Sequence, residues 1–460
     1  MFYSLAQLSA ILNAELIGDG SVVPSGVSLD SRTIGDGDCF VALKGERDGH
    51  EYALKAVQGG AACLLLDHAL DVTAPQLIVS DTLAALQKWG QTRLSEHRPK
   101  FVFGVTGSVG KTSTKEMLAA ATSAWKTPGN RNNTLGLPAA LATLPDGLEA
   151  AVLEMGMSTP GEIKRLTEIA PIDFGVIANI GSAHLENFPE GQKGIAKAKG
   201  EIIAGIRHGG AWVYPANDTW CRWLAEGNGA SDAHPVRAVP VGEGTGYFIS
   251  SIKSLGCMGS SFSVVHPSGR LNAEIRLPGL HQAQNALLAI SIALLAGFGE
   301  DEIVNGIASA QPQEGRGRLY RLVGGSWLLD ESYNASQESI LSCVKSLMEL
   351  DGGEPVAVLG CIRELGAESA SIHEATGLAL KKEGISRLWA YGDFANDYAA
   401  GFGLGAKAYP DFESMEPELA ALPTGSRILV KGSRHWKAER VVSNLLERLG
   451  VDEAEAGFRG

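Results

Sequence analysis

Cysteine is scarce in this sequence, and the six that occur stand far apart with no CxxC pair among them. Scattered cysteines form neither a zinc site nor a disulfide framework, so we expect reduced thiols in a cytoplasmic protein. We also expect no signal peptide, because the first residues do not join a basic region to an apolar core. The most apolar stretch, residues 286–299, is too short to cross a bilayer and predicts a buried core helix without membrane insertion.

Positive charge is in deficit as well, since 39 Lys and Arg stand against 52 Asp and Glu, a formal net charge of −13. A general nucleic-acid or membrane-surface binder needs a basic surface, so this balance disfavours both classes of protein. It leaves an anionic small-molecule substrate open, because a local pocket can oppose the overall charge. The sequence contains no N-K-x-D motif, which disfavours a guanine-specific switch protein and favours ATP over GTP.

The chain of 460 residues is long enough for three domains at about 150 residues each. Short β-like runs after a helical start indicate a small N-terminal α/β domain over residues 1–82. Over residues 83–312, apolar strand-like runs alternate with helical stretches, which predicts a central P-loop ATPase-like domain with a mainly parallel sheet. Residues 313–460 repeat this alternation without a GxGxxG fingerprint and indicate a Rossmann-like domain. The predicted fold class is therefore α/β, in three domains.

A phosphate-binding loop is the clearest local motif, where FVFGV-TGSVGKTS leads from a buried strand into a helix. Glycines let backbone N–H groups turn toward phosphate oxygens, and the helix N-terminus adds partial positive charge. We expect Lys111 to reach the terminal phosphates of ATP and the Thr112 hydroxyl to bind Mg²⁺. The usual G-x-x-x-x-G-K-[ST] pattern would place a glycine at Val105, so this loop is a shorter variant. The residues assigned to it are Thr106, Gly107, Ser108, Val109, Gly110, Lys111, Thr112 and Ser113.

Two more polar residues follow apolar runs of the central domain. Glu154 ends one run, and His184 comes a few residues after the next. Because the carboxyl ends of parallel strands meet at one edge of a sheet, these residues and Thr112 predict an Mg²⁺ site near the γ-phosphate. Each residue alone also fits a plainer interpretation, a helix cap or an exposed loop. On spacing alone Lys199 belongs to a solvated helix face, and residues 127–138 fit either an anion-binding loop or a surface turn.

The motifs together resemble the Mur ligase family of peptidoglycan synthesis, over nearly the whole chain. Within that family, DESYNAS (330–336) and LVKGSRHWKAE (429–439) favour the branch that adds D-alanyl-D-alanine. Two stretches depart from the family pattern: LGCIRELG (359–366) replaces LGDMLELG, and DESYNASQ replaces DDSYNANP. Both bear on dipeptide recognition and interdomain contacts more than on ATP chemistry. The other segments that carry the resemblance include SLDSRTIGDGDCFVALKGERDGH (28–50), GNRNNTLGLP (129–138), LEMGMSTPGEI (153–163), NIGSAHLENF (179–188), AKAKGEI (196–202) and PGLHQAQNALLA (278–289).

The resemblance implies an ATP-dependent ligase that joins D-alanyl-D-alanine to a UDP-N-acetylmuramoyl tripeptide through an acyl phosphate, releasing ADP and phosphate. Such a reaction serves cell-wall synthesis, and through it cell shape and division. The implied cofactors are ATP and Mg²⁺, and the implied partners are these small molecules alone. A cytoplasmic monomer is expected. Two alternative functions stay open: another Mur-type or folylpolyglutamate-type ligase, and a nucleotide-gated binding protein without ligase activity. The sequence also does not decide whether the tripeptide ends in diaminopimelate or lysine.

The resemblance also assigns roles to individual residues. It gives Lys111, Glu154, His184 and Lys199 catalytic roles, with Lys199 as a further metal ligand if it is carbamylated. The residues implied to complete the ATP site are His281, Asn285, Arg318, Asp330, Tyr333 and Asn334. The residues implied to hold the other substrates are Ser31, Arg32 and Arg47 for the UDP part, Asn132, Asn133 and Thr134 for the muramoyl peptide, and Lys431, Ser433 and Arg434 for the dipeptide.

Overall fold

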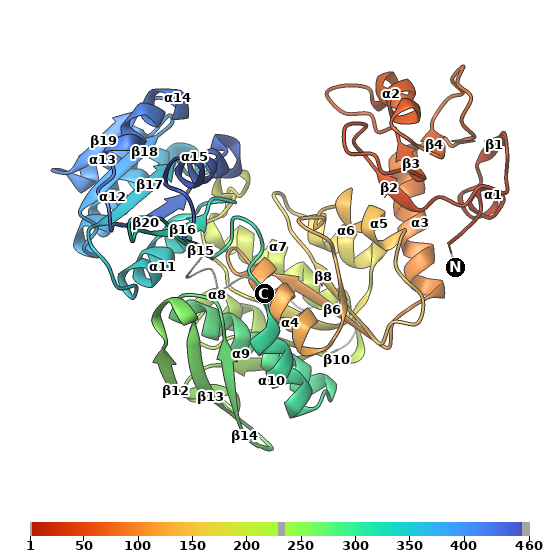
Figure 1. The fold of residues 1–460 in the computed structure, drawn as a ribbon. Coiled ribbons are helices and arrows are strands. Elements are labelled where there is room, and N and C mark those ends of the chain that lie inside the picture. The colour runs from red at the N-terminus through yellow and green to blue at the C-terminus, as the bar shows by residue number, and fades with distance from the viewer. Residues whose placement is uncertain (1, 229–234, 453–460) are drawn as a thin grey trace.

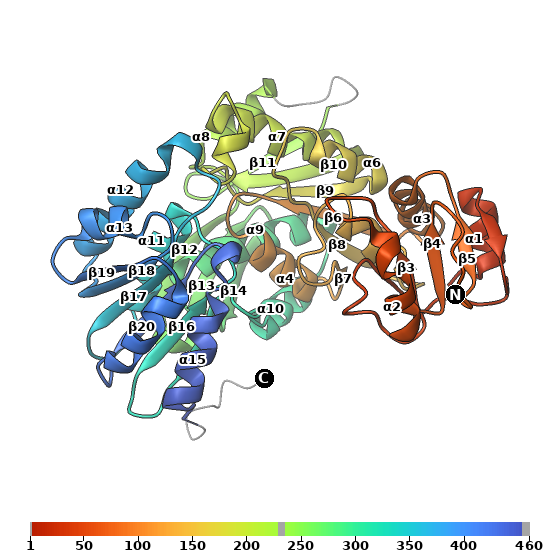
Figure 2. The same ribbon diagram turned by 90° about the horizontal axis from the view of Figure 1, so that it is seen from above.

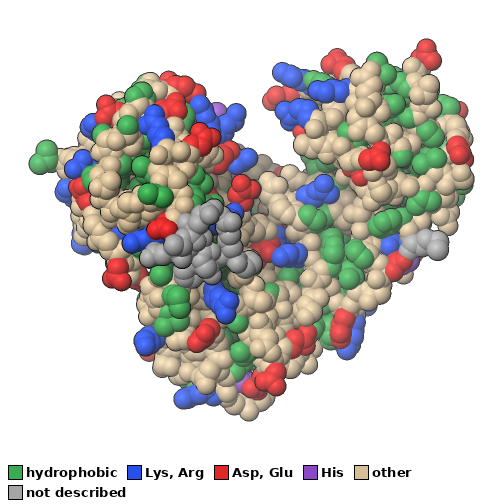
Figure 3. Space-filling model, in the orientation of Figure 1, with side chains coloured by type: hydrophobic (Ala, Val, Ile, Leu, Met, Phe, Trp, Pro, Cys, Tyr) green, Lys and Arg blue, Asp and Glu red, His purple; other side chains and the backbone are tan. Residues whose placement is uncertain are grey.

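The computed structural model of the chain describes residues 2–228 and 235–452, which form three α/β lobes (Figure 1). The N-terminal and C-terminal lobes lie on either side of the central lobe, as the perpendicular view also shows (Figure 2). A deep notch separates the two outer lobes on the face shown in Figure 3. In the part of the chain that is described, no helix combines the length and the apolar composition needed to cross a membrane.

The N-terminal lobe is built on a five-stranded sheet with the order β1-β5-β4-β3-β2, in which only the β1–β5 pair is antiparallel. Its elements are α1 (Leu5–Leu12), β1 (Glu15–Ile17), β2 (Gly26–Ser28), β3 (Asp38–Val41), η1 (Gly49–Tyr52), α2 (Ala53–Gln58), β4 (Cys63–Leu66), β5 (Gln76–Ile78) and α3 (Thr82–Glu96). Alternation along β4 sends Cys63 and Leu65 into the core under α1 and α3, and Leu64 and Leu66 into the core under α2.

The central lobe has a six-stranded, fully parallel sheet with the order β11-β10-β9-β6-β8-β7. Helices α4, α9 and α10 pack on one face, and α5, α6 and α7 on the other. The apolar stretch expected to form a core helix lies mostly in α9, which is buried from Ala286 to Ala293. The elements are β6 (Phe101–Thr106), α4 (Lys111–Ala121), β7 (Trp125–Lys126), α5 (Gly136–Leu141), β8 (Ala150–Glu154), α6 (Glu162–Ile169), β9 (Ile172–Ile177), η2 (Leu185–Asn187), α7 (Gln192–Ala204), β10 (Ile206–Pro215), α8 (Thr219–Trp223), η3 (Leu224–Asn228), β11 (Arg237–Val241), α9 (Leu280–Ala296) and α10 (Glu300–Ser309).

A small antiparallel sheet, which the sequence analysis did not anticipate, covers α9 and α10. It consists of β12 (Phe248–Ser254), β13 (Ser260–His266) and β14 (Gly269–Ile275), with η4 (Gly256–Met258) in the first turn. Burial alternates strictly along β13, so that Phe262 and Val264 join the core around α9 while their neighbours are partly exposed. This period of two is the pattern of a sheet with one covered face.

The C-terminal lobe has a six-stranded sheet with the order β15-β16-β20-β17-β18-β19, parallel except for the β15–β16 pair. Helices α11, α12 and α13 cover one face, and α14 and α15 the other. The elements are β15 (Arg318–Arg321), β16 (Trp327–Glu331), α11 (Gln337–Met348), β17 (Pro355–Gly360), η5 (Gly366–Glu368), α12 (Ser369–Lys382), β18 (Arg387–Tyr391), α13 (Ala395–Phe402), β19 (Ala406–Tyr409), α14 (Phe412–Met415), η6 (Glu416–Ala421), β20 (Arg427–Lys431), η7 (Arg434–Trp436) and α15 (Glu439–Leu449).

The observed architecture agrees with the predicted α/β class and its mainly parallel sheets. Helix α3 belongs to two cores at once, because Leu86 and Trp89 lie in the N-terminal core and Leu94 lies in the central one. The domain boundaries at residues 82 and 312 therefore stay predictions, since packing is continuous across the first of them.

Candidate functional site

The loop between β6 and α4 is packed so closely that two of its positions require glycine. A Cβ atom on Gly107 would lie 2.9 Å from the Cβ atom of Ala178, and one on Gly110 would lie 2.6 Å from Asn285 Oδ1. Gly110 also has a φ of 81°, in the left-handed region that glycine adopts without steric cost. The backbone of the short loop therefore lies so close to Ala178, at the end of β9, and to Asn285 on α9 that no side chain would fit at these two positions.

Backbone N–H groups of this loop converge on one oxygen atom. Ser108 and Val109 donate to Asn179 Oδ1 at 2.9 and 2.8 Å. The Ser108 hydroxyl accepts a hydrogen bond from the N–H of Gly181 at 2.9 Å, which ties the loop to the segment after β9. Two N–H groups aimed at one acceptor beside a helix N-terminus are the arrangement that binds a phosphate oxygen.

Two lysine side chains share a single backbone carbonyl at the loop. Lys111 Nζ donates to the carbonyl oxygen of Gly107 at 2.6 Å, and Lys199 Nζ donates to the same oxygen at 3.1 Å. Burial lowers the pKa of Lys111 to about 8, although Glu154 acts in the opposite direction. Burial, together with the charge of Lys111, lowers the pKa of Lys199 far below its ordinary value. Both amines therefore lack sufficient negative charge nearby, and an anionic ligand would supply it.

Two oxygen atoms of the predicted magnesium set are buried in the way a cation site requires. Thr112 and Glu154 are 2% and 1% exposed. Among the described residues, neither Thr112 Oγ1 nor Glu154 Oε2 has a hydrogen-bond partner, although Lys115 Nζ lies 3.4 Å from Glu154 Oε2 as an ion pair. Burial opposes ionisation of Glu154, but the charges of Lys115, Arg316 and Lys111 prevail and lower its pKa. Hard oxygen donors, one of them an ionised carboxylate, fit Mg²⁺.

The third member of that set, His184, lies in the segment after β9 and contacts the C-terminal lobe. Its Nδ1 atom pairs with Glu364 Oε2. Two residues earlier, Ser182 donates to Glu338 Oε1 from its hydroxyl at 2.9 Å and from its N–H at 3.2 Å. The segment is thus held between the phosphate loop and two carboxylates of the C-terminal lobe.

A cleft opens between the central and C-terminal lobes at this place. Most residues predicted to bind ATP line it, whereas Arg318 is exposed on β15, and Asp330 is buried on β16 and does not line the cleft. Thr106, Gly107 and Thr112 are buried and do not line it either. The predicted residues that line the cleft are Ser108, Val109, Gly110, Lys111, Ser113, His281, Asn285, Tyr333, Asn334 and Lys431.

The C-terminal wall of the cleft carries cations that the sequence analysis did not single out or assigned elsewhere. The Arg316 guanidinium lies 3.9 Å from the centre of the Tyr333 ring, and Arg434 lies 5.8 Å from the same ring. Lys431, predicted for the dipeptide, forms a buried ion pair with Glu331 at 3.3 Å. Sequence reasoning missed Arg316 because it preferred the neighbouring arginine of the GRGR repeat, and it missed Glu331, the second acidic residue of the DES segment.

In two of the segments predicted to bind substrate, the polar groups form hydrogen bonds with other groups of the protein. Asn132 Nδ2 donates to Glu154 Oε1 at 2.8 Å, which joins the asparagine loop to the predicted metal ligand. The side chain of Asn133 and the carbonyl of Thr134 accept hydrogen bonds that hold the loop and α3 together. Ser433 is buried, and its hydroxyl accepts a hydrogen bond from the N–H of Arg363 at 3.0 Å.

The residues predicted to bind the UDP part lie in the N-terminal lobe, away from the cleft. Arg32 is 77% exposed at its side chain and pairs with Asp30 at 2.6 Å, while Ser31 is buried beside it. Tyr52 raises the pKa of the Arg47 guanidinium, and after Asp30 it also raises that of Arg32. The two arginines therefore gather around one tyrosine, and basic side chains line the edge of this lobe that faces the notch (Figure 3).

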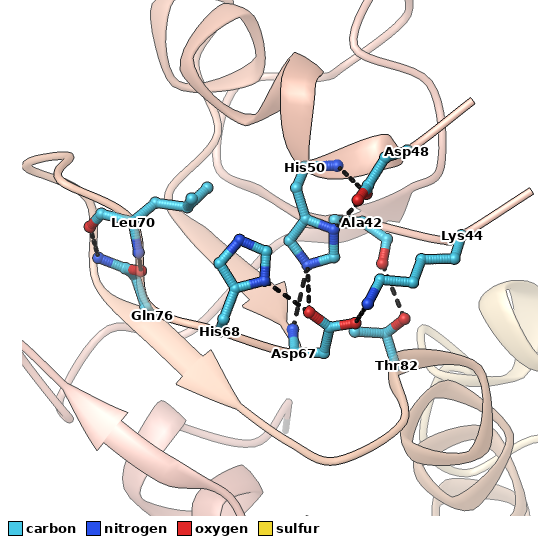
Figure 4. Close-up of polar contacts among 9 residues, drawn as sticks. All are labelled: Ala42, Lys44, Asp48, His50, Asp67, His68, Leu70, Gln76 and Thr82. Atoms are coloured by element: carbon cyan, nitrogen blue, oxygen red, sulfur yellow. Dashed lines mark hydrogen bonds and ion pairs between the residues drawn. The ribbon is translucent and has the colours of Figure 1, made fainter.

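Asp67 is the centre of a polar network that braces the loop after β3 (Figure 4). Its carboxylate accepts contacts from Lys44 Nζ at 2.6 Å and His68 Nδ1 at 2.6 Å, and His50 Nε2 lies 3.3 Å from it. His50 also receives the N–H of Asp67 at 3.1 Å and reaches Asp48 through Nδ1. Three potential metal ligands meet here, but both nitrogens of His50, the carboxylate of Asp67 and Nδ1 of His68 are already engaged with protein groups, so we interpret the network as structural.

Comparisons with known proteins agree with this arrangement. Residues 105–293 match the model of the Mur ligase middle domain. The UDP-N-acetylmuramoyl-tripeptide–D-alanyl-D-alanine ligase of Escherichia coli K12 is 35% identical over 456 residues, covering 96% of this chain and 98% of that one. A crystal structure of MurF from Acinetobacter baumannii superposes with a TM-score of 0.85 at 30% identity, over 97% of this chain and 99% of that one. MurF from Thermotoga maritima in complex with ADP gives a TM-score of 0.77 at 27% identity, over 92% of this chain and 97% of that one. The chain therefore belongs to the Mur ligase family, among the relatives of the UDP-N-acetylmuramoyl-tripeptide–D-alanyl-D-alanine ligases.

Proposed function

We propose that this protein joins D-alanyl-D-alanine to a UDP-N-acetylmuramoyl tripeptide at the expense of ATP, as a cytoplasmic monomer in peptidoglycan precursor synthesis. The observation that carries the proposal is the cleft between the two larger lobes. On one side it has the phosphate loop with Lys111, and on the other Arg316, next to the ion pair of Lys431 with Glu331. A nucleotide and an acceptor carboxylate are both anionic, so a cleft with cations on both walls suits their joint binding.

The reaction proceeds in two steps. A terminal carboxylate oxygen of the tripeptide attacks the γ-phosphorus of ATP, the bond from that phosphorus to the β–γ bridging oxygen breaks, and ADP leaves. The dipeptide amine then attacks the acyl carbon, inorganic phosphate leaves with the former C–O bond electrons, and the amine gives up a proton. Lys111 and the N–H groups of Ser108 and Val109 offset charge on the phosphates during the first step. Closure of the lobes would keep water from the acyl phosphate.

Thr112, Glu154 and His184 are the residues that would hold Mg²⁺. When bound, the ion would neutralise phosphate charge and orient the γ-phosphate. Lys199 is the candidate for carbamylation, because its amine is buried and burial lowers its pKa, which favours the neutral form that adds to carbon dioxide.

Substrates would bridge the lobes. Arg32 and Arg47 would hold the UDP diphosphate at the N-terminal lobe, and the peptide would extend past Asn132 toward the phosphate loop. Arg434 and Ser433 would hold the dipeptide at the C-terminal lobe, next to Tyr333. Such a span crosses the notch of Figure 3 and brings three reactants to one place, which removes much of the entropic barrier to ligation.

A substrate panel tests the proposal. The full-length protein is given ATP and Mg²⁺ with UDP-muramoyl tripeptides ending in diaminopimelate or lysine, and with D-alanyl-D-alanine, glutamate or a free diamino acid as the amine. Phosphate release and amide product that both depend on D-alanyl-D-alanine support the proposal. Turnover only with glutamate or a diamino acid indicates another branch of the family. Phosphate release without amide product indicates a nucleotide-gated binding protein. Lys111→Ala is the matched control, because it removes the loop cation and should silence every arm.

A further inference from the structure

His184 and Glu364 meet across the boundary between the central and C-terminal lobes. Both residues have left-handed backbone conformations, with φ of 67° and 65°, which residues other than glycine seldom adopt. Besides the side-chain contact between His184 Nδ1 and Glu364 Oε2, the carbonyl oxygen of Glu364 accepts the N–H of Glu186 at 3.2 Å. One residue of the C-terminal lobe therefore holds the histidine segment through its side chain and its backbone together.

The contact fixes which ring nitrogen of His184 is available. A carboxylate can only accept, so Nδ1 must carry a proton when it faces Glu364. In the neutral ring, this leaves the lone pair on Nε2. A histidine that binds a metal ion commonly donates its other N–H to a carboxylate, which sets the tautomer and the ring orientation. Here that carboxylate belongs to a different lobe from the histidine.

We infer that Glu364 is a positioning residue that orients His184 for metal binding, so that the metal site of the central lobe is complete only when the C-terminal lobe is docked. The inference rests on the proposed function and on the metal role of His184. Glu364 is the glutamate of LGCIRELG (359–366), which this sequence shares with the family pattern LGDMLELG, and the inference assigns it a specific role. It also couples nucleotide handling in one lobe to the presence of the lobe that would deliver the dipeptide.

A simpler role for Glu364 would be to hold the lobes together. The chain offers a matched control for that role, because Glu338 also reaches from the C-terminal lobe to the same segment. Glu338 contacts Ser182 through two hydrogen bonds, whereas the carboxylate paired with His184 is that of Glu364. Loss of either carboxylate weakens docking, but only loss of Glu364 frees the histidine ring.

The test measures how strongly binding of a fluorescent, non-hydrolysable ATP analogue to the full-length protein depends on Mg²⁺. For Glu364→Ala we expect the Mg²⁺ concentration at half-saturation to rise about 10- to 100-fold, the usual effect of removing the carboxylate partner of a metal-binding histidine. Glu364→Gln keeps an acceptor for Nδ1–H and should give a smaller rise. Glu338→Ala should change the value by less than about threefold. In a His184→Ala background, Glu364→Ala should add no further change.

Equal Mg²⁺ shifts in Glu338→Ala and Glu364→Ala, or an additive effect in the His184→Ala background, would overturn the inference in favour of simple docking. Small-angle scattering of each variant reports whether the lobes stay together, so a shift in Mg²⁺ dependence with unchanged scattering supports positioning. Failure of the proposed function is separate: it appears as wild-type protein that forms no D-alanyl-D-alanine product. Wild-type ligation together with an unchanged Mg²⁺ dependence in Glu364→Ala would defeat this inference alone.

Discussion

Lys115 is a fully buried cation, and its replacement by methionine tests how the charges of the central lobe are balanced. Its side chain is 0% exposed, and its Nζ atom lies 3.3 Å from Glu116 Oε1 and 3.4 Å from Glu154 Oε2. It also donates to the carbonyl oxygens of Thr127 and Gly129 at 3.1 and 3.0 Å. Methionine fills a similar volume without charge or donors. Lys115→Met therefore removes one cation from two buried carboxylates and a donor from two carbonyl oxygens, while Lys126 still contacts Glu116 and Asn132 still donates to Glu154.

Breaking a buried ion pair on one side costs about 3–5 kcal/mol, because the remaining charge stays buried without compensation. At about 2–4 °C per kcal/mol for a domain of this size, the transition of the central lobe should fall by roughly 10 °C. Scanning calorimetry measures this shift. The control is Lys126→Met, which removes a partner of the same Glu116 but is 45% exposed at its side chain, so it should cost less than about 1 kcal/mol. Equal shifts in the two variants would refute the reasoning.

Three further outcomes are expected. His184→Ala should lower the ligation rate by about 100-fold or more, because it removes a proposed metal ligand, and near-normal turnover would remove it from the mechanism. Lys199→Ala should lose ligation and regain part of it with short carboxylic acids, and absence of rescue would count against carbamylation. Asp67→Asn should destabilise the N-terminal lobe at neutral pH. Since contacts from Lys44 and His68 lower the pKa of Asp67 to about 2, the stability gap to wild type should be full above about pH 4 and close as pH falls toward 2, which acid titration of both proteins measures.

The parallel sheets could be predicted from the sequence because each buried strand is a continuous apolar run. FVFGV and PVAVLG are of this kind, and both became central strands, β6 and β17. The antiparallel sheet over α9 could not be predicted in the same way. Its strand SSFSVVH alternates between serine and apolar residues, and β12 has polar residues on a largely exposed edge. Its burial depends on α9, which follows later in the chain, so local pattern alone does not reveal it.

The parts of the site that lie in one continuous motif could be predicted from the sequence. The parts that depend on where a strand begins, or on contacts between distant segments, could not. The loop from Gly107 to Thr112 reads directly from its glycines and its position between strand and helix. The choice between Arg316 and Arg318 does not, because it depends on where β15 begins. The structure starts that strand at Arg318, which is then exposed, and leaves Arg316 in the preceding loop against Tyr333. The partner of His184 is likewise 180 residues away in sequence, and no local pattern could name it.

Three lysines lie around the phosphate loop, and they differ in how much negative charge lies near each of them. Lys115 faces two carboxylates, so it is compensated and holds the fold. Lys111 and Lys199 share one carbonyl oxygen, and burial lowers the pKa of both. Since a buried cation is costly without a partner, a bound anion should be stabilised most by Lys111, which lines the cleft, whereas Lys199 is the residue proposed for carbamylation. The net charge of −13 is therefore compatible with binding of a triphosphate and a carboxylate. The positive charge that lacks a paired carboxylate is concentrated at the phosphate loop, where these anions would bind.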